Sequence, residues 1–156
     1  MRHAKSSWKD PSLDDHDRPL NKRGRKDCPK MARALIERGW IPQLVLSSTS
    51  QRTRETWQRM ATEFDTSEIE LQWLESFYHG GPVEVCRQLS KLDDSYSSIM
   101  VLGHNPGWEA IVETLCGKAV RMTTANAVLL EITSDSWQEK DYSFVDVLRP
   151  KELTDN

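Results

Sequence analysis

The sequence has few cysteines and no long apolar run, and both absences restrict what the protein can be. Its three cysteines, Cys28, Cys86 and Cys116, are odd in number and widely spaced. They form no Cys-x-x-Cys pair, so we expect neither a zinc site nor a disulfide framework, and a reducing cytoplasm is the predicted location. No apolar stretch approaches the roughly 18 residues that a membrane span needs, and no signal peptide is expected.

The sequence also lacks a strong excess of either positive or negative residues. The chain has 21 Lys and Arg against 24 Asp and Glu, a formal net charge of −3. Without a basic stripe or a polybasic helix, we expect neither nucleic acid nor a membrane surface as a partner. The length of 156 residues predicts a single domain over 1–156, which we expect to be monomeric.

Helical and strand-like segments alternate along the chain. Helices are predicted from Asn21 to Arg38 and over 50–64, 82–92 and 108–115, from apolar spacing and end signals. Short apolar strands are predicted at 44–46 and 97–102, and two later candidates at 127–132 and 142–147 are expected to pair antiparallel. This order predicts an α/β fold, a three-layer sandwich with a mostly parallel central sheet flanked by helices.

Polar residues follow the predicted strands, where ligands bind in sheets of this kind. Arg52 and Arg54 come after the first strand, and His104 comes directly after the second. Arg2 and His3 would belong to the same edge if a strand came before them. Each cluster alone is typical of a solvated segment, whereas their shared position at strand ends favours one common site.

Guanidinium and imidazole groups at one site suit a phosphoryl group. The planar fork of Arg donates two parallel hydrogen bonds to phosphate oxygens. Nearby Arg charges also lower the pKa of a histidine, which leaves one ring nitrogen free to attack phosphorus. The fixed positive groups then stabilise the charge on the equatorial oxygens. The residues therefore predict phosphoryl transfer with neither a metal ion nor another cofactor.

Several short motifs, taken in order, resemble the histidine phosphatase superfamily. They are Arg-His-Ala-Lys-Ser at 2–6, Asp-Arg-Pro-Leu at 17–20, Ser-Ser at 47–48 with Arg52, and Gly-His-Asn-Pro at 103–106. Within the superfamily, the short chain and its Arg-His-Ala start resemble the SixA-like phosphohistidine phosphatases. The resemblance covers nearly the whole chain and implies a phosphoglycerate mutase-like fold.

The resemblance also implies a role for each matching residue. His3 would be the nucleophile that becomes phosphohistidine, and His104 would be the second histidine of the pocket. Arg2 and Arg52 would clamp the phosphoryl oxygens. The other matching residues, near the pocket mouth or the second histidine, are Arg18, Ser6 and Thr124.

One expected group, the glutamate that protonates the leaving oxygen in many superfamily members, has no clear match. Such an acid generally contributes about 10²–10⁴ in rate. Glu75 is the nearest candidate by order, His79 and Tyr78 are alternatives, and a surface role for each stays open. A phosphoramidate leaving group would make the absence of an acid tolerable.

The apolar strand that precedes the Arg-His pair in this family is missing. Either translation begins upstream of Met1, or the domain has lost a central strand. We expect the upstream start, because a lost central strand leaves unpaired backbone groups on two neighbours. Each such group costs about 1–3 kcal/mol when it is buried.

The favoured function is a metal-independent phosphatase that acts through phosphohistidine on His3, with phosphohistidine in a signalling protein as its substrate. Two alternatives stay open, a small-molecule phosphomonoesterase with the same pocket and a non-catalytic phosphate-binding module. The loops at 11–17 and 76–81 are expected to decide the substrate.

Overall fold

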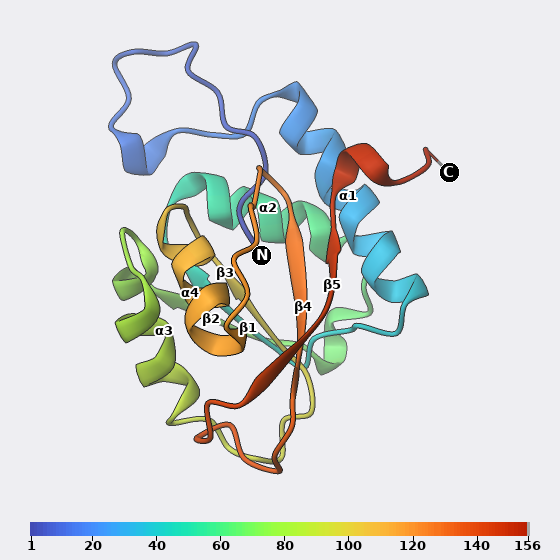
Figure 1. The fold of residues 1–156 in the computed structure, drawn as a ribbon. Coiled ribbons are helices and arrows are strands. Elements are labelled where there is room, and N and C mark those ends of the chain that lie inside the picture. The colour runs from blue at the N-terminus through green and yellow to red at the C-terminus, as the bar shows by residue number, and fades with distance from the viewer. Residues whose placement is uncertain (156) are drawn as a thin grey trace.

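A three-stranded parallel sheet forms the centre of the fold in the computed structural model, which describes residues 1–155. The middle strand β1 (Leu44–Ser48) lies between β2 (Glu70–Leu74) and β3 (Ile99–Leu102). An antiparallel pair, β4 (Ala127–Ile132) and β5 (Tyr142–Leu148), lies beside them (Figure 1). The α/β class and the antiparallel pair predicted from the sequence are confirmed.

The strand β2 was not expected, and its exposure explains why. The first three of its five residues are exposed, so its sequence carries little apolar signal. Its position comes from parallel pairing with β1, in which Val45 lies opposite Leu71 and Ser47 opposite Trp73. The partner strand therefore holds β2 in place.

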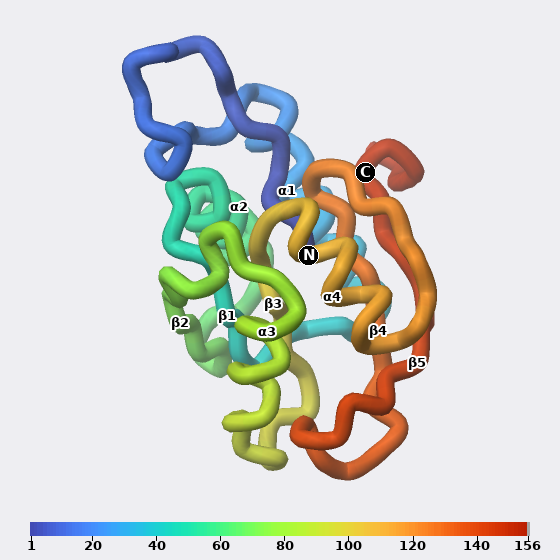
Figure 2. Tube along the Cα trace, turned by 60° about the vertical axis from the view of Figure 1, so that its left-hand side comes forward, coloured from blue at the N-terminus to red at the C-terminus, as the bar shows by residue number. Residues whose placement is uncertain are grey.

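Helices cover both faces of the parallel sheet (Figure 2). The long helix α1 (Lys22–Glu37) packs with α2 (Gln51–Ala61) on one face, and α3 (Pro82–Leu89) packs with α4 (Gly107–Cys116) on the other. All four helices occur where the sequence predicted them. None of the helices within residues 1–155 is long and apolar enough to cross a membrane.

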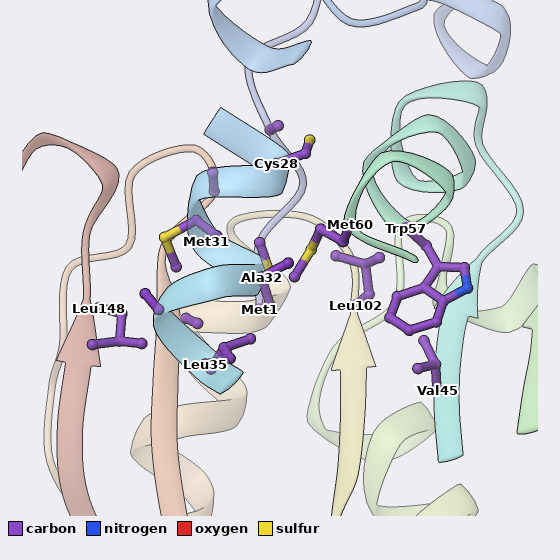
Figure 3. Packing of buried hydrophobic residues seen from close by; sticks show 14 of the residues in the cluster. Met1, Cys28, Met31, Ala32, Leu35, Val45, Trp57, Met60, Leu102 and Leu148 are labelled. Carbon is purple, nitrogen blue, oxygen red and sulfur yellow. The ribbon is translucent and has the colours of Figure 1, made fainter. Parts of the chain in front are cut away.

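Alternation along β1 sends its side chains to opposite faces of the sheet. Val45 belongs to the cluster under α1 and α2, while Leu44 and Leu46 pack against α3 and α4. Figure 3 shows the first cluster, in which Val45 and Leu102 of the sheet face the two helices. The helix side chains that meet them are Met31, Ala32, Leu35, Trp57 and Met60. The sheet is thus the middle of three layers.

The strands β3 and β4 are not paired with each other, and Met1, Arg2 and His3 lie between them. The amino nitrogen of Met1 donates to the carbonyl oxygen of Val101 at 2.7 Å, and Arg2 forms a parallel bridge with Gly103. A cavity of about 640 Å³, lined by Met1 and by residues of both strands, continues from there. The gap that was expected in the sheet is present in the described part of the chain, and these residues enter it at one end.

Candidate active site

His3 is held by backbone hydrogen bonds on both sides. Its N–H donates to the carbonyl oxygen of Gly103 at 3.0 Å, and its own carbonyl oxygen accepts from the N–H of Ala125 at 2.9 Å. The ring nitrogen Nδ1 lies 2.7 Å from the carbonyl oxygen of Ala4. A carbonyl oxygen can only accept, so Nδ1 carries the proton and Nε2 keeps its lone pair. This tautomer leaves Nε2 free to act as a nucleophile.

The surroundings of His3 also keep its ring uncharged. Burial lowers its pKa from 6.5 to about 3, and the nearby charges of Arg52, Arg2 and Arg18 act in the same direction. The hydrogen bond to Ala4 opposes this change but does not outweigh it. The ring is therefore neutral near pH 7, as nucleophilic attack requires.

His104 follows β3 directly, and its ring centroid lies 5.1 Å from that of His3. Its Nε2 lies 2.8 Å from Oγ of Ser48, the last residue of β1, while its Nδ1 is buried without a partner. Burial lowers the pKa of His104, and His3 and Arg52 lower it further. If the Ser48 hydroxyl donates to Nε2, the neutral ring presents Nδ1–H to whatever occupies the site.

Arg2 and Arg52 each bring a buried nitrogen without a partner. Nη1 of Arg2 donates to the carbonyl oxygen of Met122 at 3.0 Å, which anchors that guanidinium, but its Nε has no partner among residues 1–155. Nε of Arg52 is likewise buried and has no hydrogen-bond partner among residues 1–155. Ser50 caps α2 by accepting from the N–H of Thr53, which places Arg52 in the first turn of the helix. Two guanidinium N–H groups and the Nδ1 of His104 are thus left for a ligand that supplies acceptor oxygens.

Arg18 and Ser6, both predicted near the pocket mouth, form one buried contact. Nη1 of Arg18 donates to Oγ of Ser6 at 2.8 Å, and the Arg18 guanidinium lies 3.5 Å from the ring centroid of Trp8. Arg18 also contributes to the low pKa of His3. These residues support the segment that leads into the short 3-10 helix η1 (Asp15–Asp17), which packs beside α2 (Figure 2).

Asp15 is a site residue that the sequence analysis missed. Its carbonyl oxygen accepts from Nη1 of Arg52 at 2.7 Å, and its Oδ2 accepts from Nη2 at 3.0 Å. The hydroxyl of Tyr78 donates to the same Oδ2 at 2.6 Å, while the Tyr78 ring meets His104 edge-on at 5.5 Å. The one available sequence signal was the spacing of Asp15 and Arg18, which pair three residues apart.

Two other predicted residues, Glu75 and Thr124, make no side-chain hydrogen bond to either histidine within residues 1–155. Glu75 is exposed at the start of a 3-10 turn, where Phe77 turns into the core and Tyr78 turns toward His104. Within residues 1–155, no hydrogen bond links its carboxylate to either histidine. Thr124 Oγ1 lies 3.4 Å from Nη2 of Arg23 instead.

The remaining candidates have separate surroundings. Arg54 Nε donates to the carbonyl oxygen of Thr49 at 2.8 Å, and its guanidinium lies over the ring of Trp73. His79 and His104 both line a recess of about 340 Å³. Arg54 thus has partners of its own, whereas the charge of Arg52 lowers the pKa of both His3 and His104.

Known proteins similar to this chain include both sequence relatives and solved structures. An uncharacterized chloroplastic protein of Arabidopsis thaliana is 42% identical over 147 residues, 89% of this chain and 67% of that protein. A protein from Agrobacterium tumefaciens assigned as phosphohistidine phosphatase SixA is 27% identical, with a TM-score of 0.84 over 96% of this chain and 95% of that one. The protein histidine phosphatase SixA in complex with tungstate has a TM-score of 0.87 at 22% identity, over 99% and 97% of the two chains.

The Arabidopsis relative corrects one prediction. A cytoplasmic location was expected from the unpaired cysteines, and it is wrong, because the 42% identical relative is chloroplastic. Cysteine spacing reports only on disulfides and metal sites, and a reducing compartment is not limited to the cytoplasm.

The family model that matches the chain agrees with the motifs and with the fold. Its description is the histidine phosphatase superfamily, branch 1, and it matches residues 1–79, which include Arg2, His3, Arg18 and Arg52. The likeness to the SixA structures shows a phosphoglycerate mutase-like fold. The chain belongs to the histidine phosphatase superfamily, branch 1.

Proposed function

We propose that this protein is a metal-independent phosphatase that forms a phosphohistidine intermediate on His3, and that its substrate is phosphohistidine in a protein. The observation that carries the proposal is the free Nε2 of His3 in a site with three buried side-chain nitrogens that have no hydrogen-bond partner within residues 1–155. These belong to Arg2, Arg52 and His104. A buried N–H without an acceptor costs about 1–3 kcal/mol, which a bound phosphoryl group would recover.

In the first step, the lone pair of His3 Nε2 forms a bond to phosphorus. The bond from phosphorus to the leaving group breaks, and its electron pair leaves with that group. The ring of His3 becomes positive as this happens, and the hydrogen bond from Nδ1 to Ala4 stabilises the charge. The N–H groups of Arg2, Arg52 and His104 donate to the equatorial oxygens, where charge is spread in the transition state.

In the second step, a water molecule attacks phosphorus. The bond to Nε2 breaks and returns its electron pair to His3, while the proton of the water leaves with inorganic phosphate or is passed to solvent. The guanidinium charges that assist the first step assist this one equally, because both pass through the same charge distribution on phosphorus. Arg2 and Arg52 thereby supply the fixed positive charge that the reaction needs.

Phosphohistidine is proposed as the substrate because of the likeness to SixA proteins. The Agrobacterium protein is assigned as a phosphohistidine phosphatase, and the tungstate complex is described as a protein histidine phosphatase. The site adds a second reason. Glu75 is exposed and makes no hydrogen bond to either histidine within residues 1–155, and a phosphorylated imidazole needs less help from an acid than an alkyl ester does.

The test compares the protein with His3→Ala, using p-nitrophenyl phosphate and phosphoimidazole as substrates. We expect His3→Ala to lower kcat by about 10³ or more for both substrates. We expect mass spectrometry of the protein, quenched without acid during turnover, to find a phosphoryl group on His3. His16→Ala is the matched control, because His16 is partly exposed and hydrogen-bonds Thr49.

Three results would contradict the proposal in different ways. Full activity in His3→Ala would remove the nucleophile. Binding of phosphate without turnover by the unaltered protein would favour a phosphate-binding module. Turnover of p-nitrophenyl phosphate alone would favour a phosphomonoesterase that acts on small molecules.

A further inference from the structure

Asp15 places a fixed negative charge beside the proposed phosphate site. Partial burial raises the pKa of its carboxyl group, but hydrogen bonds from Tyr78, Arg52 and Arg18 outweigh that effect and hold the pKa well below its usual range. Oδ1 accepts from Nε of Arg18 at 3.1 Å, and Oδ2 accepts from both Arg52 and Tyr78. The group is therefore a carboxylate near pH 7.

The position of this carboxylate matters for the leaving group. His3 and His104 are each only 7% exposed, whereas the side chain of Asp15 is 44% exposed. In-line attack by Nε2 of His3 puts the leaving group on the opposite side of phosphorus, toward the open side of the site. Asp15 holds the guanidinium of Arg52 through its carbonyl oxygen and Oδ2, and its side chain is open to solvent, so we infer that its carboxylate borders the side from which the leaving group departs.

A fixed carboxylate acts in opposite ways on the two kinds of leaving group. A phosphorylated imidazole is cleaved most easily when its other nitrogen carries a proton, so that the ring leaves as neutral imidazole. A carboxylate stabilises that positively charged reactant and the route through it. The leaving oxygen of a phosphate ester instead gains negative charge, which the same carboxylate repels.

We propose that Asp15 is a specificity-determining residue whose carboxylate favours phosphorylated imidazoles over phosphate esters. This inference rests on the proposed function and deepens it. In the favoured step, Nε2 of His3 bonds to phosphorus while the phosphorus–nitrogen bond of the substrate breaks. The electron pair returns to the substrate ring, which keeps the proton on its other nitrogen and leaves as neutral imidazole.

The test measures kcat/KM of the protein and of Asp15→Asn for phosphoimidazole and for p-nitrophenyl phosphate. We expect Asp15→Asn to lower the ratio of the two values, phosphoimidazole over ester, by about tenfold, the effect of one unit charge on another in partly solvated surroundings. Asp15→Glu keeps the charge, and we expect it to restore most of the ratio. Loss of a purely structural contact to Arg52 would lower both values by the same factor.

Two controls separate charge from other effects. Asp14→Asn makes the same change in net charge at an exposed neighbour whose side chain makes no capping hydrogen bond, and the ratio should not change. Tyr78→Phe removes a hydrogen bond to Asp15 but leaves the carboxylate with both arginines, so the ratio should stay close to that of the unaltered protein.

The outcomes distinguish this inference from the proposed function. An unchanged ratio in Asp15→Asn, with turnover that still depends on His3, would overturn the role of Asp15 alone. Turnover that survives His3→Ala, or none with either substrate, would overturn both. A thermal unfolding curve of Asp15→Asn that matches the unaltered protein shows that the ratio reports on the site.

Discussion

The tautomer of His3 follows from a single contact, because the carbonyl oxygen of Ala4 can only accept the proton of Nδ1. The sequence predicted His3 as a nucleophile but not which of its nitrogens is free. His104 has the complementary arrangement, with Nε2 on Ser48 and Nδ1 without a partner. Neighbouring backbone and hydroxyl groups thus assign different tasks to two similar rings.

Ser48→Ala is expected to lower kcat about tenfold, because His104 would lose the hydroxyl that fixes its orientation and tautomer. Steady-state kinetics with p-nitrophenyl phosphate measure the effect. Ser47→Ala is the matched control, because Ser47 is equally buried and its hydroxyl donates to a backbone carbonyl. Equal losses in the two variants would show that the effect comes from β1 and not from His104.

The buried histidines also predict how stability depends on pH. The pKa of His3 is about 3 in the folded protein and about 6.5 in an unfolded chain, so between these values the unfolded state binds more protons. The contribution of the neutral His3 ring to stability is therefore fully present well above pH 6.5 and is lost as the pH falls below that value. We expect His3 alone to lower the free energy of unfolding by about 2 kcal/mol between pH 7 and pH 5.

Urea denaturation of the protein and of His3→Gln at both pH values measures this contribution. We expect the variant to show a smaller loss on acidification. The same loss in both proteins would mean that His3 is not the group that is protonated on unfolding. The comparison does not go below pH 5 because most carboxylates titrate below that value.

At the scale of elements, the helices were predictable because their signals are local. Asn21 caps α1 by accepting from the N–H of Gly24 at 2.9 Å, as the sequence suggested. The strand β2 was not predictable, because its exposed residues carry no apolar pattern and its pairing with β1 fixes it. Local signals thus gave the helices, and contacts between distant segments gave the edge of the sheet.

Gly24→Ala tests how α1 packs on the N-terminal segment. Alanine generally stabilises a helix by about 1 kcal/mol relative to glycine. Here a Cβ atom would lie 2.2 Å from the carbonyl oxygen of Lys5, so the backbone two residues after His3 would have to move. We expect the midpoint of thermal unfolding to fall by several degrees and phosphatase activity to fall with it.

Lys22→Ala is the control, because Lys22 is exposed in the first turn of the same helix. We expect its unfolding midpoint to change little. A stabilised Gly24→Ala variant would show that the helix and the segment around Lys5 are not in the close contact that the structure has.

At the scale of the whole molecule, the sheet is divided into a parallel part and an antiparallel part. Within residues 1–155, the start of the chain links the two parts: the amino nitrogen of Met1 donates to the carbonyl oxygen of Val101 at 2.7 Å, and the N–H of Arg2 donates to that of Asn126 at 3.0 Å. The cavity of about 640 Å³ lies between the edges of β3 and β4. Backbone groups along both edges are available for a further strand.

A protein with four valines added directly before Met1 is expected to be more stable than one with four glycines in the same place. Valine side chains would fill the cavity while their backbone pairs with β3 and β4. Burial of about 2 kcal/mol per side chain, less about 1.5 kcal/mol per ordered residue, leaves a gain on the order of 2 kcal/mol. Urea denaturation measures the difference, and equal stability would show that the cavity does not accept a strand.

The sequence by itself determined the fold class and the helices, and it named His3, Arg52 and His104 as candidates for one site. Periodic apolar residues, helix caps and short motifs act over a few neighbouring positions, so they can be read along the chain. The tertiary structure alone decided that Asp15 meets Arg52 and Tyr78, which are 37 and 63 residues away. Such contacts depend on how the loops pack over the strand ends, and no local pattern encodes that packing.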